Sequence, residues 1–271
     1  MSDLRVTVLG SGASGGVPLI GNNWGVCDPN EPKNRRRRCS ILIQSAETTV
    51  LVDASPDCRS QLLDAGVDRL DAVIFTHAHA DHIHGIDDLR WVNVAMEAVI
   101  PAYASEITLE QINTRFGYVF APLDEKKSRG YFYKPCLDPI PVHDEARIGD
   151  LDIRFFTQDH GFSNTLGLRI GDFGYSVDVV ELDETAFGVL DGIQTWIVGC
   201  LGPNTHPTHA HVDKVIEWVD RVRPKQAWLT HMSHLLDYRT LEEESPDHIK
   251  PAYDGMVIKG CYKKFNAGFV C

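Results

Sequence analysis

The chain has 271 residues, of which 43% are hydrophobic, and a formal net charge of −12. This length and apolar content are sufficient for one large α/β domain, which we expect to cover residues 1–271. The negative charge argues against extended nucleic acid as a partner, because proteins that follow a nucleic-acid backbone bind it through clustered Lys and Arg. No apolar run could span a bilayer and the N-terminus shows no signal sequence, so we expect a cytoplasmic protein without a membrane partner.

The chain opens with a predicted strand at residues 4–9, where every second residue is apolar. The sequence Gly-Ser-Gly-Ala-Ser-Gly at residues 10–15 then matches the dinucleotide-binding fingerprint, which requires a helix to begin there. Pro18 and Gly21, followed by two further prolines, are incompatible with that helix. We therefore predict a long loop near the active site over residues 10–37, without a nucleotide cofactor.

The basic run and the cysteines each predict a structural feature. The basic run at residues 35–38 is expected to lie in a solvated loop and to pair with the excess carboxylates, with phosphate contact as the alternative. The seven cysteines are scattered without Cys-x-x-Cys spacing, which is typical of reduced thiols.

Further elements follow from hydrophobic periodicity and turn residues. Ser-Pro-Asp at residues 55–57 offers an N-cap and a Pro at the first helical position, so a helix is expected from residue 56 to about residue 65. Residues 121–150 are rich in Pro and are predicted to form a loop or a small excursion over the site. The other predicted strands cover residues 40–44, 49–52, 72–75, 151–157, 165–170, 174–177, 196–198 and 226–229, and the other helices cover residues 83–95, 105–117 and 211–222.

The most informative segment is Thr-His-Ala-His-Ala-Asp-His at residues 76–82, which directly follows a short apolar strand. Its imidazoles and carboxylate would be costly to bury without partners, and metal coordination removes that cost. If a tight loop follows the strand, His77 and His79 can face one ion. Asp81 and His82 then turn toward a second ion. Such ligands suit zinc or manganese, with iron as a third option, so the motif predicts half of a site for two divalent metal ions.

The remaining ligands are expected from residues that follow later strands. His160 is predicted to be the third ligand of the first ion; His143 competes for this role but lies among prolines and acids typical of a surface turn. Asp178 is expected to bridge both ions, because two cations need an anion between them. His231 should complete the second ion, and His234 is either an alternative ligand or a hydrogen-bonding neighbour.

With these residues the chain resembles the metallo-β-lactamase superfamily, in which His-x-His-x-Asp-His, a later His, a bridging Asp and a final His occur in this order. Within the superfamily it is most similar to the cyclic phosphate phosphodiesterases associated with carbon–phosphorus lyase, and more distantly to tRNA 3′-processing nucleases. The similarity runs nearly end to end and includes residues 10–12, 51–54 and 229–234. The resemblance implies an α/β fold, α+β in some schemes: a four-layer αβ/βα sandwich with the metals at one sheet edge.

The resemblance also implies roles beyond metal binding. Asp53 would steady the histidine loop through hydrogen bonds, which a stiff site requires. A catalytic histidine falls at His209, where it would stabilise the phosphate in the transition state and protonate the departing oxygen, with His206 and His211 as alternatives. Asp81 is expected to be catalytic as well as a ligand.

The chain departs from the phosphodiesterase pattern in one respect. In those relatives a cluster of cysteines in the early loop holds a structural zinc together with the histidine that corresponds to His234. Here the loop region offers only Cys27 and Cys39. We therefore expect no structural zinc, and a hydrogen bond from His234 that supports the site.

The predicted function is a binuclear metal-dependent phosphodiesterase that hydrolyses a small, cyclic phosphodiester by a metal-bound hydroxide. The expected partner is a small phosphorylated substrate, such as a nucleotide or ribosyl cyclic phosphate, and a homodimer is allowed for. The first alternative is an esterase, lactonase or thioesterase, because the same metals can polarise a carbonyl. A tRNA 3′-processing nuclease is less favoured, since residues 121–150 are no basic arm. A nonenzymatic binding module is less favoured because every ligand position is filled.

Overall fold

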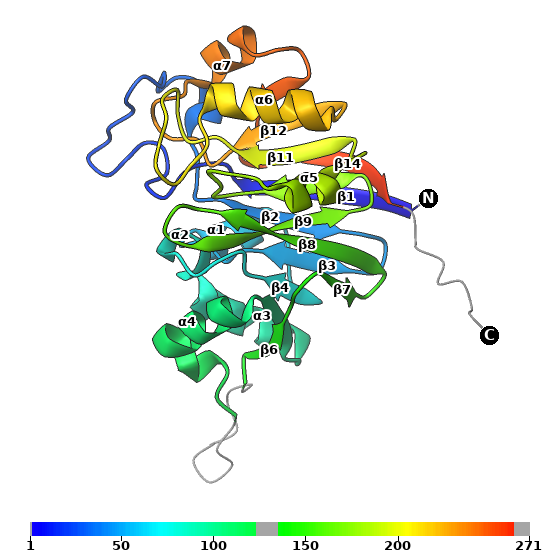
Figure 1. Cartoon of the computed structure of the whole chain (residues 1–271). Coiled ribbons are helices and arrows are strands. Elements are labelled where there is room, and N and C mark those ends of the chain that lie inside the picture. The colour runs from blue at the N-terminus through cyan, green and yellow to red at the C-terminus, as the bar shows by residue number, and fades with distance from the viewer. Residues whose placement is uncertain (1, 123–134, 263–271) are drawn as a thin grey trace, which may run out of the picture.

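In the computed structural model, which describes residues 2–122 and 135–262, two β-sheets of seven strands each face one another (Figure 1). The strands of the first sheet are β1 (Ser2–Gly10), β2 (Ser40–Gln44), β3 (Thr49–Val52), β4 (Ala72–Ile74), β5 (Ile100–Ala104), β6 (Leu137–Pro141) and β14 (Val257–Tyr262). Those of the second are β7 (Glu145–Ile148), β8 (Leu151–Asp159), β9 (Asn164–Ile170), β10 (Phe173–Ser176), β11 (Thr195–Gly199), β12 (Gln226–Thr230) and β13 (Ile249–Pro251). Their spatial orders are β14-β1-β2-β3-β4-β5-β6 and β13-β12-β11-β10-β9-β8-β7.

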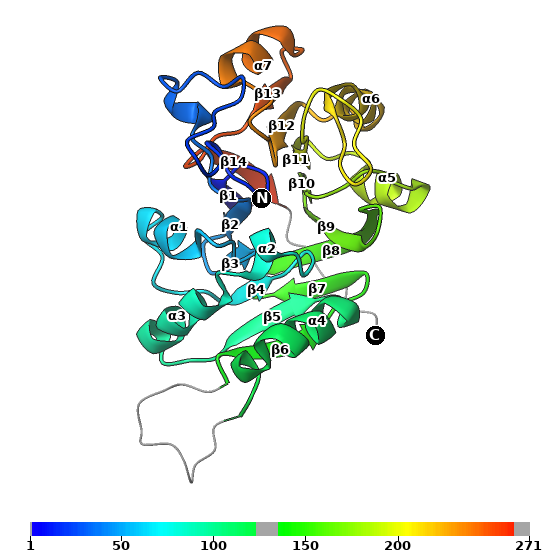
Figure 2. The same cartoon turned by 90° about the vertical axis from the view of Figure 1, so that its left-hand side faces the viewer.

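Helices cover the outer face of each sheet, so the fold has four layers (Figure 2). The helices are α1 (Cys58–Asp64), α2 (Ala80–Ile83), α3 (Leu89–Met96), α4 (Glu106–Phe116), α5 (Glu184–Leu190), α6 (Val212–Val222) and α7 (Tyr238–Glu244), with short 3-10 turns at η1 (Pro32–Asn34), η2 (Ile86–Asp88) and η3 (Gly117–Val119). The first four pack on the first sheet and the last three on the second. The predicted αβ/βα sandwich is confirmed. Within the described residues, no helix combines the length and apolarity that a membrane span requires.

Each sheet is buried on both faces, as β2 illustrates. Ile41 and Ile43 lie in the apolar layer between the sheets, whereas Leu42 lies in the layer between the first sheet and its helices. Successive strand side chains point to opposite faces, so an unbroken apolar run is required wherever both faces are covered. This explains why the central strands show no polar alternation.

Strand direction brings the polar ends of several strands to one edge. In the first sheet β3 and β4 are parallel. In the second, β8 and β10 each pair with β9 in antiparallel fashion, and β10, β11 and β12 are parallel, so β8, β10 and β12 all run the same way. The two sheets are joined at this edge, where Leu166 N donates to Thr76 O at 3.0 Å.

The glycine-rich loop after β1 begins no helix, as predicted. Its glycines allow close packing against neighbouring backbone. A Cβ on Gly10 would lie 2.0 Å from Arg38 O, and one on Gly12 would lie 2.9 Å from Arg37 O. Met232 N donates to Ser11 O at 2.9 Å on the other side. The glycines therefore let the loop pass between two backbone segments, one of which follows β12.

The basic run differs in part from its prediction. Arg37 pairs with Asp64 at 2.7 Å and Arg38 with Asp57 at 2.9 Å, which agrees with carboxylate pairing. Arg36 is buried, however, and its guanidinium donates to the Ser233 carbonyl at 3.0 Å. The run therefore connects the early loop to the segment after β12, and it is not fully exposed to solvent.

Two helix predictions are wrong in detail. The helix expected from residue 56 begins at Cys58, because Ser55 accepts a hydrogen bond from the Asp57 amide and closes a turn first. The helix expected over 83–95 is divided into α2, η2 and α3. The break falls at Gly85, where a Cβ would lie 2.0 Å from the Ser55 carbonyl oxygen.

The loop predicted over residues 121–150 is also wrong in part. Residues 123–134 lie outside the described residues, but β6 and β7 follow them. Pro139 and Pro141 misled the prediction, and both occupy β6 at the edge of the first sheet, where a missing N–H costs no ladder hydrogen bond. Further elements that were not predicted are β5, β13, β14, α5 and α7.

Candidate metal centre

The candidate site is built from residues that follow strands at the shared edge of the two sheets. His77 and Asp53 follow β4 and β3 of the first sheet. His160, Asp178 and His231 follow β8, β10 and β12 of the second. The helix α2, which carries Asp81 and His82, lies at this edge, on the left in Figure 1.

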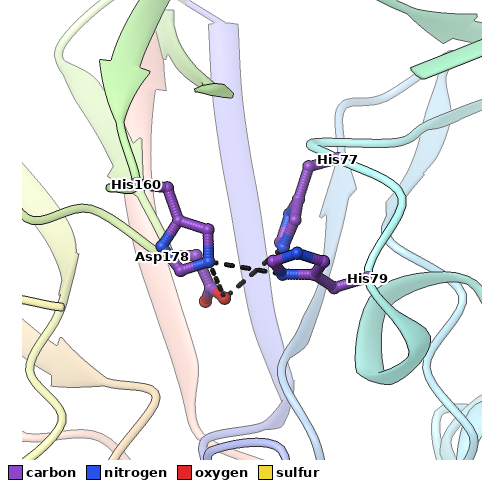
Figure 3. A group of neighbouring side chains, drawn as sticks. All are labelled: His77, His79, His160 and Asp178. Atoms are coloured by element: carbon purple, nitrogen blue, oxygen red, sulfur yellow. Dashed lines mark hydrogen bonds and ion pairs between the residues drawn. The ribbon is translucent and has the colours of Figure 1, made fainter. Parts of the chain in front are cut away.

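One cluster consists of His77, His79, His160 and Asp178, whose ligand atoms all lie within 4.8 Å of one another (Figure 3). Nε2 of His160 lies 3.3 Å from Nδ1 of His79. Asp178 Oδ2 lies 3.5 Å from His77 Nε2 and 3.6 Å from His160 Nε2. The first sheet thus contributes two imidazoles, and the second sheet contributes one imidazole and the carboxylate.

A second cluster consists of Asp81, His82, Asp178 and His231, again within 4.8 Å. Here the other oxygen of Asp178 is used: Oδ1 lies 3.0 Å from His231 Nδ1 and 3.4 Å from His82 Nε2. Asp81 Oδ2 lies 3.3 Å from His82 Nε2. The structure therefore groups the seven predicted ligands as the sequence suggested, with one oxygen of Asp178 directed to each cluster.

The donor set fits cations because its polar atoms lack other partners. Among the described residues, buried atoms without a hydrogen-bond partner include His77 Nε2, His82 Nε2, His231 Nδ1 and Asp178 Oδ1. Buried polar groups are nearly always satisfied, so four orphans in one place point to a ligand that accepts their lone pairs. Imidazole and carboxylate donors suit zinc, manganese or iron, and the described clusters contain no thiolate.

Charge in the site also favours cations. Burial opposes protonation of His231, but the Asp178 carboxylate outweighs it and raises the pKa of His231 to about 10. Burial likewise opposes protonation of His82, yet the carboxylates of Asp178, Asp81 and Asp53 raise its pKa well above the usual value. Burial lowers the pKa of His77 to about 4, with His82 adding to the effect. The carboxylates thus stabilise positive charge in the site, and bound cations would supply that charge in place of protons.

Hydrogen bonds orient two of the candidate ligand imidazoles. Asp53 accepts from the Thr76 amide at 2.8 Å and from its hydroxyl at 2.8 Å, and it contacts His82 Nδ1 at 2.7 Å. These are the contacts expected of Asp53. His160 Nδ1 lies 2.7 Å from the Thr208 carbonyl, which can only accept, so the proton sits on Nδ1 and leaves the Nε2 lone pair free.

Three site residues have a left-handed backbone. The φ angles are +64° at Asp53, +49° at Asp178 and +55° at His231. Each follows the end of a strand, at the shared edge of the two sheets. Such conformations are unfavourable for residues with a Cβ and persist where the surroundings enforce them, often at functional sites.

His209 lies beside both clusters, in a cavity of about 180 Å³ that is also lined by Ser14, Phe162, Ser163, Thr208 and five of the candidate ligands, His79, Asp81, His160, Asp178 and His231. Its ring centroid is 4.7 Å from that of His160 and 4.9 Å from that of His231. Burial, reinforced by His231, lowers the pKa of His209 to about 3. A neutral imidazole in this position is suited to donating a hydrogen bond to a bound phosphate.

Other candidate histidines lie apart from the clusters. His143 is exposed, and His211 is the N-cap of α6. His206 is exposed but close, with its ring 5.3 Å from that of His209, and its Nδ1 accepts from the Thr208 amide at 3.3 Å. Thr208 therefore connects His206 to the candidate ligand His160.

His234 belongs to neither cluster among the described residues, and its supporting hydrogen bond stays a prediction. Its ring packs so closely against Gly25 that a Cβ there would lie 2.4 Å from Cδ2. Its carbonyl accepts from the Val26 amide at 3.0 Å. Cys27 is buried beside this segment, with Sγ 3.3 Å from the Leu236 carbonyl, and no thiol joins a metal cluster within the residues described.

Four residues that line the cavity were not among the predicted site residues. Ser14 belongs to the glycine-rich loop, which was predicted to lie near the active site but without a named contact. Phe162 and Ser163 immediately follow the ligand His160, and Thr208 immediately precedes His209. Proximity to a predicted site residue was the available signal for three of these four.

The chain resembles known proteins over most of its length. Residues 48–232 match the family model described as "Beta-lactamase superfamily domain". A solved structure described as a new diphosphatase from the PhnP family is 30% identical, with a TM-score of 0.85, and the match covers 96% of this chain and 98% of that one. The ribonuclease Z of Mycobacterium avium is 27% identical over 197 residues, which are 64% of this chain and 66% of the ribonuclease.

A relative from Porphyromonas gingivalis named octanoyltransferase is 32% identical over 261 residues, which are 93% of this chain. The chain spans only about half the length of that relative, since the match covers 51% of it.

Proposed function

This chain belongs to the metallo-β-lactamase superfamily, and we propose that it is a phosphodiesterase that binds two divalent cations and hydrolyses a small, cyclic phosphodiester. The family and the His/Asp clusters support a metal-dependent hydrolase. The observation that carries the finer proposal is the Asp178 carboxylate, which directs Oδ1 to one cluster and Oδ2 to the other. A shared carboxylate is suited to neighbouring cations, whose repulsion it reduces.

In this proposal Asp178 is common to both cation sites. His77, His79 and His160 complete the first site, and Asp81, His82 and His231 complete the second. Divalent cations would supply Lewis acidity toward a phosphate oxygen and would lower the pKa of a water molecule. Zinc, manganese and iron all fit these donors.

The chain's own residues would position and recognise the phosphate. His209 would donate a hydrogen bond to it as charge builds in the transition state, which requires a donor fixed beforehand. The packing of its ring against His160 and His231 provides that fixation. The cavity of about 180 Å³ is small for a ligand pocket, which favours a phosphate with compact substituents.

The relatives favour phosphorus chemistry without deciding the substrate. A diphosphatase and a ribonuclease both act at phosphorus, and the diphosphatase structure is covered almost completely. The net charge of −12 argues against long RNA. We propose a small phosphorylated substrate, with residues 1–271 acting as one domain. Acyl-ester hydrolysis is the competing function, because the octanoyltransferase relative is named for acyl chemistry.

The decisive experiment combines metal analysis with parallel assays. Bound metal is measured by mass spectrometry, and hydrolysis is measured with bis(4-nitrophenyl) phosphate and with a lactone. The variants are Asp178→Ala and His209→Ala, with His143→Ala as a matched control, because His143 is an exposed histidine outside both clusters. We expect Asp178→Ala to lose metal and activity together. His209→Ala should keep the metal and lose about 100-fold in phosphodiester turnover.

The outcomes separate the alternatives. Turnover of the lactone without turnover of the phosphodiester would establish the acyl-ester function instead. Full activity of His209→Ala would reject the role of His209. A metal-loaded protein that is inert toward both substrates would favour a nonenzymatic binding module.

A further inference from the structure

We propose that Phe162 determines specificity by stacking on a planar ring attached to the substrate phosphate, such as a nucleobase. This inference rests on the proposed phosphodiesterase function, and it narrows the substrate to diesters that carry a flat ring. The supporting observations are the exposure of Phe162, the rigidity of its turn and an unpaired hydroxyl beside it.

Phe162 is 91% exposed, the most exposed of the aromatic side chains in residues 2–122 and 135–262. It nevertheless lines the same cavity as the candidate ligands His79 and Asp178. A ligand whose phosphorus lies at the clusters therefore brings its substituent to this ring. Stacking of two aromatic faces would remove apolar surface from water on both partners.

The turn that carries Phe162 is held in place by several contacts. Gly161 N donates to Asp159 Oδ1 at 2.7 Å, and His160 N donates to Ser163 O at 2.9 Å. Gly161 has φ +78°, and a Cβ there would lie 2.7 Å from Pro207 O, so the turn lies directly against the segment that leads to His209. The ring of Phe162 thus projects from a rigid backbone, which limits the entropy lost on stacking.

The next residue adds a polar feature to the same wall. Ser163 lines the cavity, and its Oγ is buried without a hydrogen-bond partner in the described structure. A buried unpaired hydroxyl is costly unless a ligand pairs with it. An aromatic face next to a free hydroxyl suits a substrate that joins a flat ring to a hydroxylated or phosphorylated unit, as nucleosides do.

A planar ring fits these features better than an acyl chain. The cavity of about 180 Å³ is too small to enclose a long alkyl chain, and Phe162 offers an open face and not a tunnel. Stacking on an open face requires only a second flat ring. Because every nucleobase has such a face, this contact would accept different bases.

The test compares two five-membered cyclic diesters, adenosine 2′,3′-cyclic phosphate and glycerol 1,2-cyclic phosphate, of which only the first carries a ribose and a planar base. Hydrolysis is followed by ³¹P NMR for wild type, Phe162→Ala, Phe162→Leu and Phe162→Trp. Trp91→Ala is the matched control, because Trp91 is an exposed aromatic residue on α3 that does not line the cavity. Binding of AMP and of glycerol phosphate to the metal-loaded protein is measured by calorimetry.

We expect Phe162→Ala and Phe162→Leu to lose about tenfold in kcat/KM for the adenosine substrate, mainly through KM, and less than twofold for the glycerol substrate. Phe162→Trp should retain the preference, since it restores a flat face. Equal losses on both substrates, or no loss on either, would overturn the proposal.

The two hypotheses fail in different ways. Hydrolysis of the glycerol substrate without a base preference would uphold the phosphodiesterase and refute the role of Phe162. If neither diester is hydrolysed, the function is rejected, and calorimetry still decides on stacking. In that case, Phe162→Ala is expected to weaken the binding of AMP about tenfold and to leave the binding of glycerol phosphate unchanged. Any other result refutes the stacking role as well.

Discussion

The Asp53 carboxylate lies 2.7 Å from Nδ1 of His82, and both side chains are completely buried. This contact directs Nε2 of His82 toward Asp81 and Asp178. Asp53, which follows β3 of the first sheet, therefore fixes the orientation of the candidate ligand His82 on α2.

Replacing this carboxylate should weaken metal binding without unfolding the site. Asn is the appropriate substitution in Asp53→Asn, because Asn tolerates the left-handed φ of +64° and keeps the shape of the side chain, while it removes the charge and replaces one acceptor oxygen by an NH2 donor. We expect metal affinity to fall about 10- to 100-fold, as is typical when the partner of a ligand imidazole is lost. Competition with a chromogenic chelator measures the change. Asp68→Asn, at an exposed acid, is the control, and equal affinities of the two variants would contradict the assignment.

The left-handed backbone at His231 predicts an unusual order of stabilities. With φ at +55°, a Cβ is unfavourable at this position whereas glycine is not. In the presence of chelator, His231→Gly should be more stable than His231→Ala by about 1 kcal/mol, as measured by urea unfolding. At the exposed His143 the order should reverse, because glycine there only adds entropy to the unfolded chain. A less stable His231→Gly would show that the turn imposes no strain.

Asp150 should make stability depend on pH. Burial would raise its pKa, but hydrogen bonds from Ser45, Tyr262 and Thr48 outweigh burial and lower it to about 2. Ser45 and Thr48 flank the turn between β2 and β3, whereas Asp150 precedes β8, so this carboxylate links the two sheets.

Because the folded pKa lies below the unfolded value of 3.8, the stabilisation is present above about pH 4 and is lost as pH falls toward 2. Asp150→Asn should therefore lower the free energy of unfolding by about 2 kcal/mol at pH 7 and by much less near pH 2. Urea titrations at several pH values measure both. Asp144→Asn, at an exposed acid nearby, is the control variant.

Gly10 and Gly188 should respond to alanine in opposite directions. A Cβ on Gly10 would meet Arg38 O at 2.0 Å, a backbone atom that cannot move alone, so Gly10→Ala should destabilise by more than about 2 kcal/mol. Gly188 lies within α5 with nothing within 4 Å of its Cβ position, so Gly188→Ala should stabilise by about 0.5–1 kcal/mol. Thermal unfolding distinguishes the two. If Gly10→Ala leaves the stability unchanged, the glycine-rich motif has no packing role.

Where the sequence alone was informative, the physical signal was local. The apolar runs that ended at His77, Asp178 and His231 predicted strands, and a strand delivers its last residue to a sheet edge. The prolines at 18, 29 and 32 ruled out a helix in the glycine-rich segment by removing amide donors. By contrast, Pro139 and Pro141 misled, because only the position of β6 at a sheet edge makes them acceptable.

By itself the sequence determined the αβ/βα architecture through its resemblance to a known family, and it identified the candidate ligands through short patterns of residue types at strand ends. Only the tertiary structure decided which residues share the cavity, that His234 packs on Gly25 away from the clusters, and that Phe162 projects beside the candidate ligands. These facts depend on how two separate sheets meet at one edge, and no local pattern encodes the distance between residues that belong to different sheets.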